Sequence, residues 1–589
     1  MEGRLNNEQR LAIAVLLAIG VIIGTNLLFG PPPPPPPDEV NPAVVEAPAE
    51  PEAPEAPPVR AELLPDTGDV PVLPTLDPQD TIPAVADPAE GEEVAPPPPE
   101  RTLVVEGPLY RVVLSSRGAR VTGVELPRFE SFARQGPAEL VADAEHGVLG
   151  TRLVVGADTV DLRRVAFEVE APELIQLRED GPSERVTFTY RHPTDPFVFE
   201  VTYTFEPDDY AFGVTGRVRG LERALALTDL GRGLALNDSD PVMEEREMAF
   251  VVNHVQNGIR SERLSGVDRS RLDDGPFHWV AVKSRYFVIG LLPSLDPGGT
   301  EFFGGVMARP VVLGEDMETA EVAVTHSLRS GGIFDFRVFA GPQDYQLLSA
   351  AARDFQEVNP VGWRFIRPIL RPFVGIIMWV LVSLHETLSI GYGWVLILFG
   401  VMMRVLLFPL NHKAMRAQLR NMAVQPLLKD IQTKYKDQPE KMQKELMKLY
   451  KEHGFNPLAG CWPMLLPWPV LIALFFVFQN TIELRGVPFA WLPDLAMKDP
   501  LFILPVLLGI SMFLMQWISF RTMEEINPQM KMMMWLLPIF MVVIFANLPS
   551  GLNLYYLTAN LATLPQSWWI ANERKKVQAK GPPVAAAEA

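Results

Sequence analysis

The spacing of hydrophobic residues changes along the chain and divides it into regions of different structure. Leu11 to Phe29 is an uncharged apolar run, and about 20 such residues in a helix span the hydrocarbon core of a bilayer. Between residues 101 and 340 apolar and polar positions alternate, which is typical of strands. Long apolar runs return beyond residue 390. The pattern predicts a membrane anchor, a sheet domain and a bundle of membrane helices, in that order.

The alternating region predicts an antiparallel sheet with one face exposed to water. From Phe197 to Phe205 the odd-numbered positions, which hold Val201 and four aromatic residues, share one face, while Glu200, Thr202 and Thr204 take the other. The same alternation runs through 186–190. Further strand candidates are 109–114, 121–126, 210–218, 279–292, 321–327 and 334–340. So many strands with few helical runs predict a large β-sandwich.

Five long apolar runs follow the sheet region and predict a helical membrane core. They cover 391–410, 462–479, 501–518, 532–548 and 551–570, and with the first anchor they make six predicted spans. The loop between the first two of the five is rich in basic residues, among them Lys413, Arg416, Lys434, Lys436 and Lys441. Because basic loops stay on the cytoplasmic side, we expect this loop and both termini in the cytoplasm and the β-sandwich in the periplasm.

The segment between the β-sandwich and the five later runs is predicted to form two helices. Tyr345 to Val358 has the composition of a surface helix. Trp363 to Leu388 mixes apolar runs with arginines, and its uncharged stretch, 372–384, is short for a span. We interpret it as an amphipathic helix lying in the membrane interface. A further transmembrane span is the alternative, but a single crossing must separate the periplasmic sandwich from the basic loop.

Composition adds a linker and excludes some classes of protein. Residues 31–100 are rich in proline, alanine and glutamate, which predicts a disordered tether. Pro31 to Pro37 follow the first apolar run, where a secretory signal peptide would have a small-residue cleavage site, so we predict an uncleaved anchor. The net charge of -19 argues against nucleic-acid binding. Cys461 is the single cysteine, which rules out an intramolecular disulfide.

Together these observations predict six regions. They are the N-terminal transmembrane anchor (1–30), the Pro-rich periplasmic linker (31–100), the periplasmic β-sandwich (101–344), the periplasmic and interfacial helices (345–390), the five-helix core (391–571) with a cytoplasmic helical hairpin (411–455), and a basic, then flexible, cytoplasmic tail (572–589).

Arg404 is the candidate functional residue, because it is a charged side chain inside an apolar run. An arginine at the centre of a bilayer costs about 2.5–3.5 kcal/mol, and more without water or a partner. The five later runs contain no aspartate or glutamate that would pair with it. The simplest alternative is that its side chain snorkels to the cytoplasmic interface. Charged residues inside membranes more often face the bundle interior or a wet cavity.

Polar neutral residues on the last run form a possible counterpart to Arg404. Asn553, Tyr556, Asn560, Thr563 and Ser567 are spaced so that they share one helix face. Gln516 lies in an earlier run. Two interpretations stay open: these groups hydrogen-bond between helices and hold the bundle together, or they line a hydrated groove with Arg404.

Motifs for covalent chemistry are missing from the sequence. There is no GxxxxGK[ST] phosphate loop, no nucleophile elbow and no His or Cys pair at metal-ligand spacing. We therefore expect no enzymatic activity, no cofactor and no metal.

Three motifs resemble those of the YidC-type membrane protein insertases (YidC/Oxa/Alb) of Gram-negative bacteria. They are Arg404-x4-Pro409-Leu410, Asn456-Pro-Leu-Ala-Gly-Cys-Trp-Pro-Met-Leu465, and Pro549-Ser-Gly-Leu-x-Leu-Tyr-Tyr556 with Asn560 downstream. Their order and spacing agree with that family over 347–570, and Trp279-Val-Ala-Val-Lys-Ser-Arg-Tyr-Phe287 resembles its periplasmic domain. The chain departs from the pattern at Pro467, where the family usually has a glutamine, which leaves a polar groove contact on that helix open.

The resemblance implies a protein that inserts and helps fold nascent membrane proteins in the inner membrane, alone or with the Sec translocon. It implies that Arg404 is the groove arginine and that Tyr556 lies on the helix contacted by substrate. The predicted groove consists of Arg404, Gly400, Gln516, Asn553, Tyr556, Asn560 and Thr563. The basic hairpin would bind the ribosome or components of the signal-recognition pathway, membrane lipid is a further partner, and no sequence-specific nucleic-acid binding is expected. The alternatives are an anion transporter with Arg404 as its substrate site, and a structural scaffold of the secretion apparatus.

Overall fold

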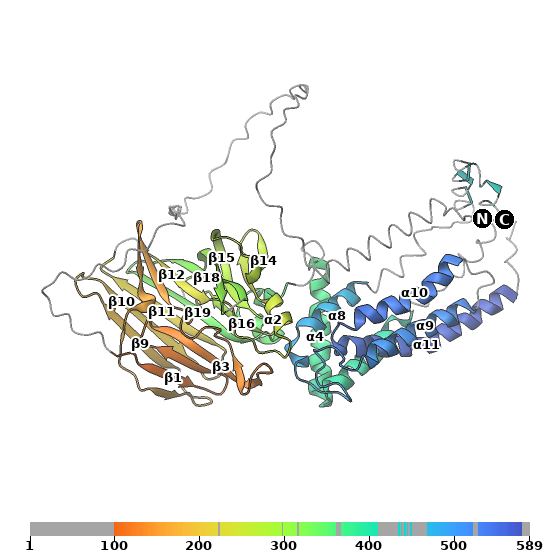
Figure 1. The fold of residues 1–589 in the computed structure, drawn as a ribbon, viewed down its shortest axis with the longest axis horizontal. Coiled ribbons are helices and arrows are strands. Elements are labelled where there is room, and N and C mark those ends of the chain that lie inside the picture. Colours follow the sequence, from red (N-terminus) through yellow and green to blue (C-terminus); the bar gives the residue numbers. More distant parts are fainter. Residues whose placement is uncertain are drawn as a thin grey trace, which may run out of the picture. The chain divides into compact units, whose positions relative to one another are not determined.

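The computed structural model describes residues 99–221, 224–296, 298–314, 317–360, 367–409, 468–521 and 528–579, with scattered positions between 431 and 449. Among these residues the strands lie between Thr102 and Pro342, and the long helices begin at Arg367 (Figure 1). The predicted anchor, almost all of the Pro-rich linker, Pro467 and the end of the tail lie outside the described residues.

Within the described part of the chain the strands form two sheets. The five-stranded sheet has the order β4 (Pro137–Glu139), β3 (Arg120–Glu130), β2 (Arg111–Ser115), β1 (Thr102–Glu106), β8 (Leu174–Gln176). The 14-stranded sheet has the order β6 (Asp158–Asp161), β5 (Thr151–Val155), β12 (Ala224–Gly231), β18 (Met317–Ser327), β17 (Phe303–Leu313), β15 (Arg271–Lys283), β16 (Phe287–Leu292), β19 (Ile333–Pro342), β11 (Ala211–Arg219), β10 (Val198–Phe205), β9 (Glu184–Arg191), β7 (Glu168–Val169), with β13 (Ala249–His254) joining β14 (Gly258–Arg263) to β15. The described pairs are antiparallel except β1 with β8. Short helices lie between strands: η1 (Leu162–Arg164), α2 (Pro241–Glu247) and η2 (Leu264–Gly266).

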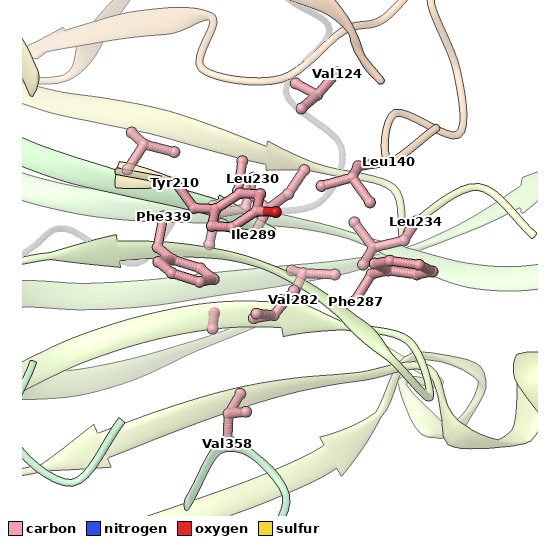
Figure 2. Packing of buried hydrophobic residues seen from close by; sticks show 14 of the residues in the cluster. Val124, Leu140, Tyr210, Leu230, Leu234, Val282, Phe287, Ile289, Phe339 and Val358 are labelled. Atoms are coloured by element: carbon pink, nitrogen blue, oxygen red, sulfur yellow. The ribbon is translucent and has the colours of Figure 1, made fainter. Parts of the chain in front are cut away.

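The small sheet packs on one face of the large sheet, which makes the domain a β-sandwich as predicted. Tyr110 stacks at tilted angles against Phe205 and Phe212 with ring centroids 6.2 and 6.5 Å apart. Phe129 of β3 meets Phe287 of β16 edge-on at 5.8 Å. Figure 2 shows Val124 and Leu140 among the other residues of this shared core. Such burial of large aromatic side chains supplies the main stabilising term of the domain.

The predicted strands are confirmed where the alternation is clear and wrong where burial hides it. β9, β18 and β19 contain the predicted runs, and β10 and β11 each begin one residue later than predicted. The buried positions of β10 alternate with half-buried ones. The prediction of one strand over 279–292 is wrong, because a turn at 284–286 separates β15 from β16. β16 is buried at every position, so both of its faces are covered and the period of two disappears.

The predicted surface helix over Tyr345–Val358 is also wrong in part. It is two pieces, α3 (Tyr345–Ala351) and the 3₁₀ turn η3 (Phe355–Val358), separated at Asp354, which has a left-handed φ of 57°. Phe355 is fully buried against Trp279 and Phe339, with ring centroids 5.1 and 5.6 Å apart. η3 therefore covers the face of the large sheet opposite the small sheet, which explains why β16 is buried on both sides.

α4 (Arg367–Leu388) is one continuous helix of 22 residues. Leu370, Val374, Ile377, Met378 and Leu381 form its buried stripe. Its opposite face is also apolar, with Ile369, Ile376 and Trp379 more than half exposed. By length and composition α4 is able to cross a membrane, so the interfacial placement of this helix stays a prediction that rests on the charge distribution of the loops.

The later apolar runs are helices. They are the helix Tyr392–Pro409, α8 (Trp468–Asn480), α9 (Ile503–Phe520), α10 (Pro528–Phe545) and α11 (Ser550–Ala579), with the short turn η5 (Ile482–Leu484) between α8 and α9. Among the described residues Arg367–Leu388 and Tyr392–Pro409 reach the length and hydropathy of a span, whereas Val470–Gln479, Ile503–Ile518 and Trp535–Phe545 are shorter apolar helices. The count of six spans therefore stays a prediction.

Small residues let these helices approach one another closely. α9 contacts both α10 and α11 (Figure 1). At Gly509 of α9 an added Cβ would lie 2.4 Å from Val542 Cγ2 of α10, so Val542 would have to shift. Glycine at such a position allows backbones to come together where hydrophobic driving force between helices is weak.

Candidate functional site

Arg404 lies beside α11. It is half-buried on the helix Tyr392–Pro409. Of the ionisable groups that the structure describes, those close enough to interact with its charge are the phenols of Tyr555 and Tyr556 on α11. Among the described residues no carboxylate forms an ion pair with Arg404. The guanidinium thus has hydroxyl-bearing aromatic neighbours in place of a counter-ion.

Gly400 explains how the two helices come this close. It lies one turn before Arg404, and a Cβ at this position would be 3.2 Å from Thr558 Cγ2 and 3.4 Å from the Tyr555 carbonyl oxygen. At these distances the neighbouring atoms would have to shift to admit a larger side chain. The predicted site residue Gly400 therefore lies at the close contact between the arginine-bearing helix and α11.

The tyrosine pair belongs to an aromatic cluster built from four helices. Tyr555 is 4% exposed and contacts Phe399 and Phe478 with ring centroids 5.7 and 6.1 Å apart. Tyr556 is half-buried and meets Phe545 edge-on at 5.1 Å. The cluster fixes the position of both phenols, since aromatic side chains packed on several sides have little rotamer freedom.

Asn553 and Asn560 form hydrogen bonds between helices. The fully buried Asn553 donates from Nδ2 to the Phe545 carbonyl at 2.9 Å, which satisfies the C-terminal end of α10. Asn560 donates from Nδ2 to Ser511 Oγ on α9 at 3.1 Å, and Ser511 donates in turn to the Leu508 carbonyl at 2.7 Å. These contacts favour the interpretation that both asparagines hold the bundle together.

The other predicted groove residues are less closely tied to Arg404. Thr563 donates to the Ala559 carbonyl of its own helix at 2.6 Å. Gln516 is half-buried on α9. The structure therefore brings Gly400, Arg404 and Tyr556 together. It adds Tyr555, whose signal in the sequence was its place in the Leu-Tyr-Tyr motif, and Ser511, a lone hydroxyl in an apolar run.

The predicted hairpin residues are only partly described. Lys413, Arg416 and Lys436 lie outside the described residues. Lys434 and Lys441 are exposed, and the Lys434 ammonium lies 5.5 Å from the centroid of the Tyr435 ring.

A second polar cluster, which sequence reasoning missed, joins the β-sandwich to the loop between α8 and α9. Arg485 of this loop has a side chain only 4% exposed. Its Nε donates to Asp238 Oδ1 at 3.0 Å, and its two terminal nitrogens donate to the Glu130 and Asn237 carbonyls, both at 2.9 Å. The guanidinium also lies 4.4 Å from the centroid of the Phe132 ring. Each of the three guanidinium nitrogens of Arg485 therefore donates a hydrogen bond, as expected for a buried arginine.

Arg285 makes the reverse contact from the β-sandwich. It donates from Nε to the Gln479 carbonyl and from Nη2 to the Ala496 carbonyl, both at 3.1 Å. Its Nη1 lies 3.9 Å from Asp238 Oδ2. We call this pair of opposed contacts, through Arg285 and Arg485, the arginine clasp. Burial outweighs the two nearby guanidinium groups and raises the pKa of Asp238.

Glu244 binds the backbone of the segment that carries Asp238. Its Oε2 accepts hydrogen bonds from the backbone N–H groups of Asn237 and Asp238 at 2.7 and 2.8 Å. Burial, together with the nearby Asp238 carboxylate, raises the pKa of Glu244 to about 7. This carboxyl group therefore changes its charge near neutral pH at a fully buried position.

The structure also gathers His146, Asp229 and Glu321, which have the chemistry of metal ligands. Arginines already supply the positive charge at both carboxylates. Asp229 accepts from Arg152 at 2.6 Å and from Arg163 at 2.8 Å, and Glu321 accepts from Arg163 at 3.2 Å. We assign the cluster to an ion-pair network that ties β5, η1, β12 and β18 together.

Comparison with known proteins identifies both parts of the chain. Residues 383–578 match the family described as 60Kd inner membrane protein, and residues 102–375 match the YidC periplasmic domain. The membrane protein insertase YidC of Prosthecochloris aestuarii is 30% identical over 501 residues, covering 80% of this chain and 82% of the relative. That of Chlorobium phaeovibrioides is 30% identical over 497 residues, covering 80% and 83%.

Solved structures give a weaker comparison. A crystal structure of an active YidC insertase with its first transmembrane domain resolved covers 80% of this chain and 93% of its own, at 17% identity and a TM-score of 0.32. A galactose mutarotase related enzyme from Lactobacillus acidophilus covers 41% of this chain at 12% identity and a TM-score of 0.25. TM-scores this low carry no structural argument, so the assignment rests on the sequence relatives. The chain belongs to the YidC family of membrane protein insertases.

Proposed function

We propose that this protein is a membrane protein insertase of the inner membrane, which inserts and helps fold nascent membrane proteins through a groove containing Arg404. The observation that carries the proposal is the position of Arg404. It is half-buried in an apolar helix, beside the phenols of Tyr555 and Tyr556, without a carboxylate partner among the described residues. A charge of this kind inside a membrane marks a functional site.

The surfaces of the core helices support a membrane location. On α9 the side chains of Ile510 and Trp517 are 57% and 42% exposed, and on α10 those of Ile539 and Val543 are 61% and 62% exposed. Apolar surface of this extent is unfavourable in water and requires a lipid or protein partner. The family relatives, named as membrane protein insertases, support the same placement.

In the proposed mechanism Arg404 lowers the barrier that the membrane presents to a polar segment. The guanidinium attracts the acidic or polar part of a nascent protein into the groove, while the apolar helix of the substrate passes into lipid. The transfer of that helix supplies the driving force, at about -0.3 to -0.6 kcal/mol for each Leu, Ile, Phe or Val. Insertion then needs no nucleotide and no covalent chemistry.

The remaining assignments extend this proposal to partners and topology. The N- and C-termini and the basic hairpin would lie in the cytoplasm, where exposed Lys434 and Lys441 are available to the ribosome or signal-recognition components. The β-sandwich would lie in the periplasm, with six spans in total and the anchor at 1–30. Work with the Sec translocon is proposed for those substrates that need it.

Replacement of Arg404 tests the mechanism. In cells depleted of the native protein, Arg404→Lys should retain most insertion of a small phage-coat-type substrate, measured by protease protection, because it keeps the charge. Arg404→Ala should lose most of it, because it leaves no charge in the groove. Arg521→Ala is the matched control, since Arg521 also lies at a core helix but packs over Trp517 at 4.6 Å.

Two outcomes would overturn the proposal. Full insertion by Arg404→Ala at normal expression and thermal stability would remove the role of the charge. Normal insertion after depletion of the whole protein would favour the other candidate functions, a transporter if solute uptake is lost and a scaffold if assembly of the secretion apparatus is lost.

A further inference from the structure

A pocket away from Arg404 lies where α3 and η3 meet α4 and α8. It has a volume of about 220 Å³ and is open to solvent. Its polar wall includes Gln356, Glu357 and Arg371, and its apolar wall includes Val374 and Met378 of α4. Phe476 and Val477 of α8 complete the apolar side. A pocket with one charged end and one apolar end is suited to bind an amphiphilic ligand.

Two oxygen atoms at the polar end lack donors. Glu357 is 7% exposed, and its Oε1 pairs with Arg371, but its Oε2 has no hydrogen-bond partner among the described residues. Gln356 Oε1 is buried and unpartnered in the same part of the structure. A buried acceptor without a donor is costly, and for a charged oxygen the cost is larger. The pocket therefore calls for a ligand with several N–H donors.

A carboxylate oxygen without a donor favours a cationic ligand group. Asp354 and Glu357 both line the pocket, and Arg371 lies beside both, with its Nη2 4.0 Å from Asp354 Oδ1. Arg353 Nε lies 3.7 Å from Asp354 Oδ2, so the two carboxylates and the two guanidinium groups balance. The preference for a cation therefore comes from Glu357 Oε2, a charged acceptor that has no hydrogen-bond partner among the described residues. Arg371 is itself 44% exposed, so its outer face remains accessible to an anionic group such as a phosphate.

The apolar side of the pocket points to a lipid. Its wall combines Val374 and Met378 of α4 with two side chains of α8, Phe476 and Val477, and acyl chains would lie against these four. Ile376 of α4, 59% exposed, lies on the opposite face of the helix and does not line the pocket. A basic peptide would satisfy the charge at the polar end but would leave the apolar wall without an apolar partner.

We propose that this pocket binds the headgroup of a phospholipid that carries a primary amine, such as phosphatidylethanolamine, from the periplasmic leaflet. The ammonium would donate to Glu357 Oε2 and Gln356 Oε1, and the phosphate would lie at Arg371. The acyl chains would follow Val374 and Met378 toward α8. The inference rests on the proposed topology, in which α4 lies at the periplasmic interface, and it is independent of the role of Arg404.

Lipid retention by the purified full-length protein tests this site. Native mass spectrometry would compare phosphatidylethanolamine with phosphatidylcholine, whose quaternary ammonium has no N–H, and with phosphatidylglycerol, which has no cation. The wild-type protein should retain phosphatidylethanolamine about tenfold better than either, as expected for hydrogen bonds to a charged group. Equal retention of the three lipids would overturn the proposal.

Three variants locate the site. Glu357→Gln should abolish the preference, because it removes the charge. Met378→Trp should reduce retention by filling the pocket while it leaves the Glu357–Arg371 pair in place, so that it separates lipid loss from loss of the ion pair. Ile376→Trp, on the exposed face of α4, is the control and should behave as wild type.

Unchanged preference in Glu357→Gln, or unchanged retention in Met378→Trp, would overturn the proposal. Displacement of the lipid by a lysine-containing peptide at lower concentration than by phosphatidylethanolamine would also overturn it. Retention is measured without any insertion substrate. A failure here therefore leaves the proposed function intact, and a failure of the Arg404 test leaves this result intact.

Discussion

Arg485 donates to Asp238 across 247 positions of sequence, and this contact is buried on both sides. The two side chains are each 4% exposed, and they come from a loop of the helical core and from the β-sandwich. With Arg285 running in the opposite direction to the Gln479 and Ala496 carbonyls, the contact joins the two parts of the protein at a defined place.

Arg485→Ala should destabilise the protein strongly. Loss of one partner from a buried ion pair costs about 3–5 kcal/mol, since Asp238 stays buried with only the more distant Arg285 guanidinium, at 3.9 Å, beside it. The free energy of unfolding in detergent, or the melting temperature, would measure the loss. Arg219→Ala is the matched control, because Arg219 pairs with Glu200 at 3.3 Å on an exposed surface, and such pairs contribute about 1 kcal/mol or less. Equal losses in the two variants would contradict the buried contact.

Because of Glu244, we expect the folded state to lose stability as the pH rises through the neutral range. Its folded pKa, about 7, is above its unfolded value of 4.5, so the folded state binds more protons between these values and stability falls with increasing pH. Glu244→Gln keeps an oxygen acceptor but cannot ionise. It should gain up to about 3 kcal/mol over wild type between pH 4.5 and pH 8. Denaturation over this range would measure the gain, and Glu245→Gln, one residue along α2, should not alter the slope.

Gly400→Val should separate the arginine-bearing helix from α11. The added carbons would press on Thr558 and the Tyr555 carbonyl, and overpacking of this kind costs about 1–3 kcal/mol. We expect reduced insertion activity together with a lower melting temperature. Gly391→Val provides the comparison, because no atom lies within 4 Å of a Cβ added at that glycine. Wild-type behaviour of Gly400→Val would show that close contact between these helices is not needed.

His326→Phe should stabilise the β-sandwich. Both nitrogens of the fully buried His326 ring are unpartnered among the described residues, and the ring stacks on Phe336 at 4.8 Å. Burial lowers the pKa of His326 to about 3, so the unfolded state binds more protons between pH 3 and pH 6.5, and stability rises with pH there.

Phenylalanine at position 326 should remove this slope and add about 1 kcal/mol at neutral pH, because no buried nitrogen is left unpaired. Denaturation at several pH values would measure both effects. His192→Phe, at a half-buried surface position, is the control. A destabilised His326→Phe variant with an unchanged slope would indicate that the imidazole has a partner in solution.

Strands could be predicted from the sequence where one face of the strand is buried and the other is exposed. β9 and β10 could be predicted because one face is covered and the other is not, which preserves the alternation. β16 could not, because the small sheet and η3 cover both faces and make its run continuously apolar. The break at Asp354 was missed for a different reason, since its left-handed backbone has no signal in hydrophobic spacing.

Some residues of the candidate site could be predicted from the sequence and others could not. Arg404 was predictable because a charge in an apolar run is conspicuous, whatever surrounds it. Arg485 was not, because an arginine in a loop between spans has the same local pattern whether it is solvated or buried, and its partner lies far away in sequence. Asn553 and Asn560 were found by their spacing, but only their acceptors, the Phe545 carbonyl and Ser511, distinguish a bonding role from a groove.

Arg285 donates only to main-chain oxygens of the helical core, at Gln479 and Ala496. Any amino acid at those two positions would present the same carbonyl. Substitutions at those two positions should therefore leave the contact between the β-sandwich and the helical core intact. A substitution at position 285 would remove the donor itself. In a chimaera that carries the helical core of a relative, Arg285 would still find both acceptors.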